Sequence, residues 1–255
     1  MTEPALLPDD STDAASEDAS RFPAVLLENL VFRWPGRTRA TLDIPAFTAR
    51  RGEHVFIAGP SGSGKSTLLG LIAGILVPSE GAVFVDGTRL SELGGARRDA
   101  FRGDHIGVVF QQFNLIPYLS VLENVLIPCR FSPLRCARAA AHAGSPRQAA
   151  HTLLERLDMP PALWNRTAKQ LSVGQQQRTA AARALIGSPS VLIADEPTSS
   201  LDADRRAVFL RLLLGECTAS GATLLFVSHD LALADAFSAV VSLPELNRAP
   251  EEDGA

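Results

Sequence analysis

The chain has 255 residues, which is the size of one domain, or of one domain with an additional lobe, and is long enough to bury a substantial core. Hydrophobic residues make up 46% of the sequence and charged residues 20%, so the fibrous, collagenous and wholly disordered classes are excluded. The formal net charge is −4, but segments 1–20 and 251–253 hold nine of the 28 acidic residues, and the remaining 19 against 24 basic residues leave the body at +5. A body this mildly basic suits nucleotide phosphates better than a long nucleic-acid track.

The cysteines and the apolar stretches bear on the compartment. The three cysteines, Cys129, Cys136 and Cys217, form no CxxC pair and are odd in number, so we expect buried thiols in a reducing compartment rather than a disulfide framework. The N-terminus lacks the basic and apolar regions of a signal peptide. The longest apolar stretch, 68–77, contains two glycines and is too short to span a bilayer. We therefore expect a soluble chain that would serve a membrane only by docking.

Hydrophobic runs and turn residues divide the chain into elements. Segment 1–21 is acidic and rich in Ser, Ala and Pro, so we expect it to be disordered, and we expect 246–255 to be an acidic tail. Between them, residues 22–245 should form one domain. The expected strands are 24–32, 41–48 (split by Pro45), 53–58, 81–86, 106–110, 191–194, 223–227 and 239–243.

Helical patterns lie between these strands. One follows the Gly/Ser loop after residue 58 and continues to about residue 75, and another covers about 203–214. The region of about 112–170 is rich in Ala, Leu and Arg at helical spacing, is interrupted by Gly-Ser-Pro at 144–146, and has no strand pattern. We expect this region to be an inserted α-helical lobe. The alternation of strands and helices elsewhere predicts an α/β fold with a mainly parallel sheet.

A loop with a phosphate-binding pattern follows the third expected strand. The pattern G-x-x-x-x-G-K-S, between a strand and a helix, is typical of a P-loop. The alternative is a Gly/Ser-rich turn before a helix, which would have no need of the complete pattern. Glycines let backbone N–H groups turn toward a phosphate, and the helix that starts at Lys65 adds its positive dipole end. The Lys65 ammonium can reach the β- and γ-phosphates, and the Ser66 hydroxyl can ligate Mg²⁺. The expected nucleotide-binding residues are Gly59, Pro60, Ser61, Gly62, Ser63, Gly64, Lys65, Ser66 and Thr67.

Two carboxylates follow the buried strand 191–194. Asp195 and Glu196 come directly after four apolar residues, at the carboxyl end of a strand, where open parallel sheets bind their ligands. We expect Asp195 to hold the magnesium shell and Glu196 to polarise a water for in-line attack on a phosphate. An acidic pair alone could equally be a solvated strand end, but the P-loop upstream favours the catalytic interpretation.

A third motif, LSVGQQQR at 171–178, has the features of a helix start. Ser172 can cap the helix, and Gln175, three residues later, completes a capping box. The N–H groups and the positive dipole end of this helix would form a second site for an anion. By itself, however, a capping box is usually only structural.

Together, these motifs resemble the ATP-binding subunit of ATP-binding cassette (ABC) transporters over about residues 24–243. The family's order of an aromatic residue, phosphate loop, glutamine loop, helical lobe, signature, acidic strand end and histidine is found here. The resemblance implies a P-loop NTPase fold of the ABC type, with an antiparallel β region beside the parallel core. It also implies further site residues: Trp34 stacking on adenine, Gln111 touching Mg²⁺ and the attacking water, Asp202 in a loop that crosses to the partner, and His229 contacting the γ-phosphate.

Two of these assignments have plain structural alternatives, and a third has a competing neighbour. Trp34 could be a core aromatic residue, and His229 could be one of the many histidines that follow a strand without a catalytic role. Gln112 is the less favoured neighbour of Gln111. Only the position of each residue in the order of motifs favours the functional interpretation.

The resemblance also implies partners and a mechanism. Two copies of the chain would pair head to tail, with each ATP between the phosphate loop of one copy and the signature residues Ser172, Gly174 and Gln175 of the other. ATP and Mg²⁺ would be bound, and hydrolysis would loosen the dimer and energise a separate transmembrane permease at the cytoplasmic face of the inner (plasma) membrane. No direct nucleic-acid partner is expected. Segments 110–117, 122–125 and 175–178 resemble the macrolide-exporter and lipoprotein-release branch.

One residue departs from the family's usual LSGGQ signature, because Val173 replaces the first glycine. A β-branched residue resists positive φ, so the site accepts valine only in a helical or extended conformation. Because of Val173, an alternative function is an ATP-binding module whose hydrolysis is impaired. The presence of Glu196 and His229 weighs against this alternative. A non-transport ABC ATPase acting on ribosomes or DNA is a further alternative, against which the single cassette without sustained heptads weighs.

Overall fold

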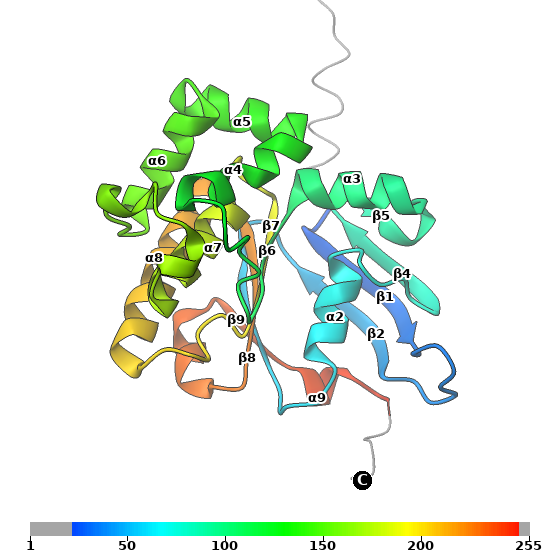
Figure 1. Cartoon of the computed structure of the whole chain (residues 1–255). Helices are drawn as coiled ribbons and strands as arrows, with labels where there is room; N and C mark the ends of the chain where they lie inside the picture. Colours follow the sequence, from blue (N-terminus) through cyan, green and yellow to red (C-terminus); the bar gives the residue numbers. More distant parts are fainter. Residues whose placement is uncertain (1–21, 250–255) are drawn as a thin grey trace, which may run out of the picture.

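The computed structural model describes residues 22–249. The segment expected to be disordered, 1–21, and most of the expected acidic tail lie outside the described residues. Two sheets and a set of helices make up the part that is described (Figure 1). None of these helices combines the length and the apolar character needed to cross a membrane.

One sheet is antiparallel and contains the first strands of the chain. Its strands are β1 (Val25–Phe32), β2 (Leu42–Ala49), β4 (Glu80–Val85) and β5 (Thr88–Arg89). They lie in the order β2-β1-β4-β5, with β1 antiparallel to both β2 and β4. The antiparallel β region implied by the family resemblance is therefore confirmed.

The second sheet is parallel and contains the strands that lead to the phosphate loop, to Glu196 and to His229. Its strands are β3 (His54–Ala58), β6 (Ile106–Val109), β7 (Val191–Asp195), β8 (Thr223–Ser228) and β9 (Ala239–Ser242). They lie in the order β6-β7-β8-β3-β9, and every pair is parallel, as the sequence predicts. The register pairs Ala58 with Ser228 and Asp195 with Val227. The carboxyl ends of β7, β8 and β3 therefore meet at one edge of the sheet.

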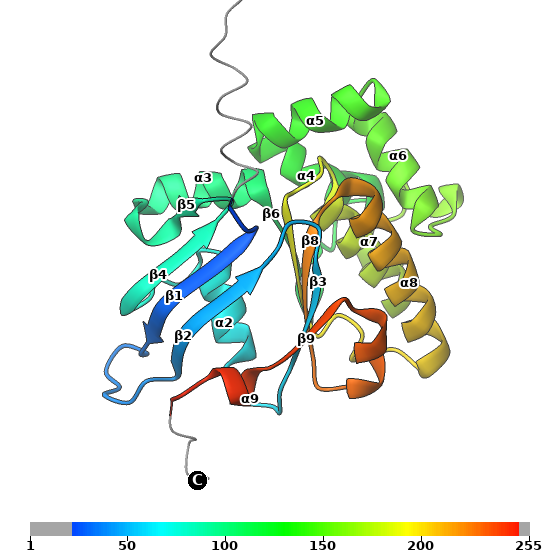
Figure 2. The same ribbon diagram turned by 180° about the vertical axis from the view of Figure 1, so that it is seen from behind.

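Alternate residues of the parallel strands face two different hydrophobic clusters. In β3, Val55 and Ile57 pack into the cluster that contains α2 (Lys65–Ile72). Phe56 packs into the cluster that contains α7 (Val173–Leu185) and α8 (Ala203–Ser220). A sheet covered on both faces requires such continuous apolar strands. Figures 1 and 2 show α2 and α7 on opposite sides of the parallel sheet.

Helices α4 (Val121–Phe131), α5 (Pro133–Ala143) and α6 (Pro146–Arg156) form a lobe between β6 and α7. Two Ser-Pro pairs set its internal boundaries. Ser132 and Ser145 cap α5 and α6, and a proline follows each cap at the first helical position, where its missing N–H is not needed. The remaining short elements of the described chain are η1 (Leu90–Glu92), η2 (Pro161–Leu163), η3 (Ala168–Gln170), η4 (Leu231–Ala236) and α9 (Leu243–Leu246).

Local details differ from the sequence expectation for physical reasons. Helix α3 (Gly95–His105) was not predicted, and none of its residues is buried, so its sequence carries no apolar stripe. Helix α2 ends at Ile72 rather than near residue 75, because Gly74 adopts a left-handed conformation with φ of 65°. Strand β2 continues through Pro45 without a break, since β2 lies at the sheet edge and can lack an N–H donor.

A buried carboxylate joins the two sheets. Asp86, which follows β4, accepts hydrogen bonds from the Ser190 hydroxyl and from His105 Nδ1, the latter at 3.2 Å. Arg51 Nη1 lies 2.7 Å from its other oxygen. Burial alone raises the pKa of Asp86, but these partners outweigh burial and hold it below its ordinary value. The charged form of Asp86 therefore stabilises the junction between the sheets.

We expect Asp86→Asn to lower the free energy of unfolding by about 2 kcal/mol near neutral pH, because charged hydrogen bonds of this kind contribute about 1.5–3 kcal/mol each. The folded-state pKa is depressed, so the stabilisation exists above the unfolded pKa and disappears as the pH falls through the folded one. Urea unfolding at several pH values should show the difference between variant and wild type shrinking below about pH 4. Glu80→Gln in the exposed Arg33 pair is the control and should change stability little. A constant difference down to pH 3 would contradict this assignment.

Candidate functional site

The phosphate loop connects β3 to α2 in the predicted context. Helix α2 begins at Lys65, and Gly64 precedes it with φ of 93°. A Cβ at Gly64 would lie 2.9 Å from Leu42 Cδ2, and Gly62 is also left-handed, with φ of 84°. Both positions therefore require glycine. The rest of the expected loop, Gly59, Pro60, Ser61, Ser63, Ser66 and Thr67, surrounds these glycines, with Ser61 and Ser66 exposed.

The Lys65 ammonium is held under this loop. Its Nζ donates to the carbonyls of Gly59 and Pro60 at 2.8 and 2.7 Å, and it lies 3.6 Å from a carboxylate oxygen of Glu196. The side chain is 6% exposed. Lys65 is therefore a buried cation that is shared between the loop carbonyls and a carboxylate.

Ser66 and Asp195 come together at the start of α2 and the end of β7. The Ser66 hydroxyl lies near enough to the Asp195 carboxyl to lower its pKa, and both groups are hard oxygen donors of the kind that Mg²⁺ prefers. Burial raises the pKa of Asp195, and the hydrogen bond from Ser66 opposes the rise. Among residues 22–249, no three His, Cys, Asp or Glu side chains gather into a cluster that could hold a metal alone. The donors present are hard oxygens, which fit Mg²⁺ that keeps water and phosphate oxygens as further ligands.

Glu196 and His229 form the second half of the site. Glu196 Oε2 lies 3.1 Å from His229 Nδ1, so the ends of β7 and β8 bring these two side chains together. Glu196 has φ of 44°, a left-handed conformation that costs a non-glycine residue about 1–2 kcal/mol. Its N–H donates to the Val227 carbonyl at 3.0 Å, which ties this turn to β8. Strain of this kind is typical of catalytic positions.

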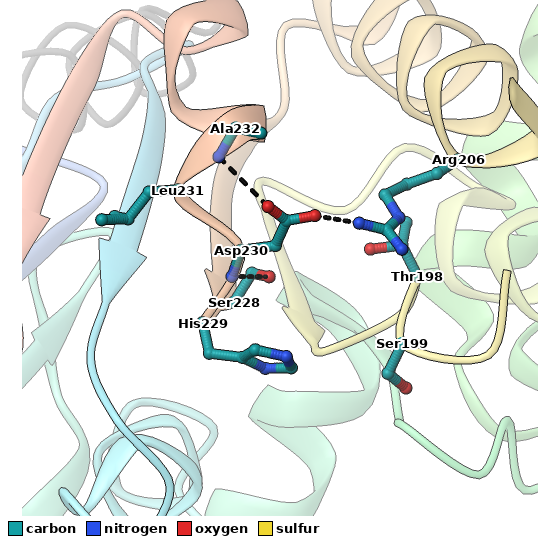
Figure 3. Close-up of a pocket in the computed structure, with 8 residues that line it drawn as sticks. All are labelled: Thr198, Ser199, Arg206, Ser228, His229, Asp230, Leu231 and Ala232. Atoms are coloured by element: carbon teal, nitrogen blue, oxygen red, sulfur yellow. Dashed lines mark hydrogen bonds and ion pairs between the residues drawn. The ribbon is translucent and has the colours of Figure 1, made fainter. Parts of the chain in front are cut away.

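His229 borders an open cavity of about 400 Å³ (Figure 3). Ser199 and Thr198 line it from the turn after Glu196, and Asp230 forms an ion pair with Arg206 across it. The His229 side chain is 60% exposed, so it is not a buried structural histidine. Its imidazole is therefore accessible to a ligand at the edge of the sheet.

Trp34 lies in the connection between β1 and β2 and is 41% exposed. It packs edge-on against Phe32, with ring centroids 5.0 Å apart and an interplanar angle of 84°. The same connection ends at Leu42, which contacts Gly64 of the phosphate loop. Trp34 is thus not a core residue, and its partly exposed ring is available to stack on a flat ligand.

Gln111 and Gln112 follow β6, and both are exposed. The next two residues, Phe113 and Asn114, are left-handed, with φ of 58° and 48°. Arg183 of α7 helps to hold this turn, because its guanidinium donates to the carbonyls of both residues. None of the sequence motifs predicted this role. A charged residue inside the run Ala-Ala-Arg-Ala-Leu was the one signal in the sequence.

The signature begins α7 with the expected capping box. Ser172 Oγ accepts from the Gln175 N–H at 3.4 Å, and Gln175 Oε1 accepts from the Ser172 N–H at 3.0 Å. Val173 is the first helical residue and is 47% exposed, so valine meets the conformational condition set by its β-branch. A Cβ at Gly174 would meet no atom within 4 Å. The open surface at this helix start allows a ligand to approach closely.

Asp202 has a local role in this chain. Its carboxylate accepts from the Arg205 N–H at 2.9 Å and so caps the N-terminus of α8. The residue is exposed. Its expected part in contacting a partner stays a prediction.

The comparisons with known proteins agree with this geometry. Residues 42–199 match the sequence profile of the ABC transporter family. An ABC transporter ATP-binding protein of Mycobacterium tuberculosis is 39% identical over 243 residues, which cover 92% of this chain and 94% of the relative. The macrolide export ATP-binding/permease protein MacB 1 of Aeromonas hydrophila is 40% identical over 78% of this chain and 29% of that longer protein.

A solved structure extends the agreement to the fold. The dimeric post-hydrolysis state of the ATP-binding cassette MJ0796, bound to ADP and Pi, matches with a TM-score of 0.75 and 34% identity over 91% of this chain and all of that one. The motifs at the edge of the parallel sheet, the family match and the shared fold lead to one conclusion. This chain belongs to the ABC transporter family and is one of its ATP-binding, ATP-hydrolysing subunits.

Proposed function

We propose that this chain energises a membrane transporter of the exporter or lipoprotein-release type by binding Mg²⁺-ATP between two copies of itself and hydrolysing it. The observation that carries the proposal is the convergence of Lys65, Asp195, Glu196 and His229 at one edge of the parallel sheet. The similarity to a macrolide exporter and the resemblance of segments 110–117 and 122–125 support the branch.

ATP would lie along the phosphate loop with its adenine on Trp34. Lys65 would exchange its contacts with loop carbonyls for contacts with the β- and γ-phosphates, and the N-terminus of α2 would add its dipole. Ser66, Asp195 and Gln111 would hold Mg²⁺, which supplies positive charge that offsets the negative charge of the phosphates. These side chains supply oxygen donors of the kind that magnesium prefers.

Glu196 and His229 would act on the reacting γ-phosphate. The Glu196 carboxylate would orient and polarise the attacking water, and His229 would contact the γ-phosphate oxygens. Their contact at 3.1 Å keeps both side chains at one position. Since Lys65 also lies near Glu196, the approach of phosphate would draw the cation away and leave the carboxylate free for water.

A second copy of the chain is part of the proposal because the sheet separates α2 from α7. The residues Ser172, Gly174 and Gln175 stand at the start of α7, on the face of the sheet opposite the phosphate-loop helix. A signature helix contributed by another copy would bring a second positive helix terminus to the same triphosphate. The dimeric state of the related MJ0796 cassette supports this arrangement. Asp202 would then face the partner copy.

A groove between α3 and α4 suits the membrane partner. It measures about 380 Å³ and is lined by apolar residues that include Phe110, Ile127 and Phe131. Phe131 is 83% exposed, which is unusual for a phenylalanine outside an interface. Gln111 directly follows Phe110, so an occupant of the groove would sit next to the glutamine loop. We assign this groove to a separate transmembrane permease, which would place the chain at the cytoplasmic face of the inner (plasma) membrane.

We expect Glu196→Gln to reduce ATP turnover by a factor of about 10²–10⁴, the usual contribution of a general base. The same variant should dimerise more strongly with ATP, because the groups that bind ATP remain while it is no longer cleaved. Phosphate release and light scattering measure the two effects. Glu155→Gln on the exposed surface of α6 is the control. A variant that hydrolyses ATP normally, or that stays monomeric with Mg²⁺-ATP, would refute the proposed function.

Lys65→Ala should weaken ATP binding by about tenfold to a hundredfold, because the phosphates lose a charged hydrogen-bonding partner. Isothermal titration with ATP checks the prediction. The matched control is Lys169→Ala, which removes the chain's other lysine from an exposed position far along the sequence. Equal affinities of wild type and Lys65→Ala would show that Lys65 does not bind phosphate.

Val173→Gly should raise the rate of ATP hydrolysis, because the exposed valine side chain at the first position of α7 hinders close approach of the nucleotide. Steady-state ATPase rates of the two proteins test this. Gly174→Val, which adds the same bulk one residue later, should lower the rate. Equal rates for wild type and Val173→Gly would discard the idea that Val173 slows closure.

A further inference from the structure

Two side chains of α7 bond to backbone carbonyls of the catalytic segments. Gln177 Nε2 donates to the Pro197 carbonyl at 2.7 Å, one residue after Glu196. At the other end of the helix, Arg183 Nη2 and Nη1 donate to the carbonyls of Phe113 and Asn114 at 2.6 and 2.7 Å. One helix is thus attached to both the turn of the carboxylate and the glutamine loop.

Gln177 is an unfavourable residue for stability alone. It is 1% exposed, and its Oε1 has no hydrogen-bond partner among the described residues. An apolar side chain of similar size would avoid burying an unpaired amide oxygen. Its one bond instead fixes the carbonyl beside Glu196, whose own φ of 44° is strained and needs support from its surroundings.

Arg183 is likewise a polar residue that is at least half-buried in α7 and bonds to backbone carbonyls. Burial lowers the pKa of Arg183, and its guanidinium donates to backbone carbonyls of the glutamine loop. The guanidinium donates hydrogen bonds to two successive carbonyls, a geometry that suits its planar arrangement of several N–H donors. Those carbonyls belong to Phe113 and Asn114, both left-handed. Two backbone hydrogen bonds and the burial of Phe113 also support this turn, and the Arg183 fork ties it to α7.

The position of these bonds along α7 makes the helix a mechanical link. Gln177 lies little more than one turn from the capped start at Ser172, and Arg183 lies in the last turn. Because the hydrogen-bonded helix moves as a unit, displacement of its N-terminus carries both bonds with it. Helix α2, which follows the phosphate loop, packs on the other face of the sheet, away from α7.

We propose that Gln177 and Arg183 are positioning residues that set Glu196 and Gln111 in place according to the position of the signature helix. The inference rests on the proposed function, since it concerns how those two residues are held for ATP hydrolysis. Contact of the signature with a nucleotide on another copy would thereby be transmitted to the water-activating segments.

The test compares Gln177→Met, Arg183→Met and Arg183→Lys with the wild type in the full-length chain. Arg178→Met is the matched control, because Arg178 lies on the same helix and bonds to Asp158 of the lobe rather than to a catalytic segment. Steady-state kinetics gives kcat, titration of the monomeric protein gives the Kd for ATP, and thermal unfolding gives Tm.

We expect both methionine variants to lose about tenfold to a hundredfold in kcat, the usual effect of misplacing a reacting group by about 1 Å, with the Kd for ATP within about twofold. Arg183→Lys keeps the charge but not the fork, so it should regain Tm without regaining kcat. Unchanged kcat in both methionine variants, or recovery of kcat by the lysine in step with Tm, would overturn the inference alone. A wild type without turnover would overturn it together with the proposed function.

Discussion

Three neighbouring parallel strands end at one edge of the sheet, and the whole site depends on that alignment. The register sets the end of β3 beside the end of β8, and the end of β8 beside that of β7. The phosphate loop, Glu196 and His229 therefore start from adjacent points, although more than 160 residues separate the first from the last. A slip of one residue in this register would point the side chains of a strand to the opposite face.

Electrostatic balance at this edge keeps the charged groups ready for a phosphate. Lys65 is shared between two loop carbonyls and Glu196, Asp195 lies near Ser66, and Glu196 lies within hydrogen-bond distance of His229. Each charged group thus has a partner that holds its position but leaves part of its hydrogen-bonding capacity for a ligand. In the proposed function, a triphosphate would offer Lys65 a stronger partner than a carbonyl, and the movement of Lys65 would alter the surroundings of Glu196 as well. The proposed binding and the proposed chemistry would then be linked through one ammonium group.

The two faces of the parallel sheet carry different parts of the site. Helix α2, which follows the phosphate loop, packs on one face, whereas α7 on the other carries the signature and bonds to the segments of Glu196 and Gln111. The antiparallel sheet brings Leu42 against Gly64 of the phosphate loop and is attached to the parallel core through Asp86. The phosphate-loop helix and the signature helix of one chain are thus on opposite faces of the sheet.

The sequence alone determined the local elements and the chemistry of the motifs. Glycines at 62 and 64, the Lys65 helix start, the Ser172 capping box and the apolar strand before Asp195 are all encoded within a few residues, so they could be predicted. Only the tertiary structure decided what depends on contacts between distant segments. The surface helix α3 has no apolar stripe, the junction at Asp86 joins residues far apart in the chain, and Gln177 and Arg183 look like ordinary helix residues until their carbonyl partners are known. A short-range pattern specifies a conformation, but a buried polar group acquires its role from the acceptor that folding brings to it.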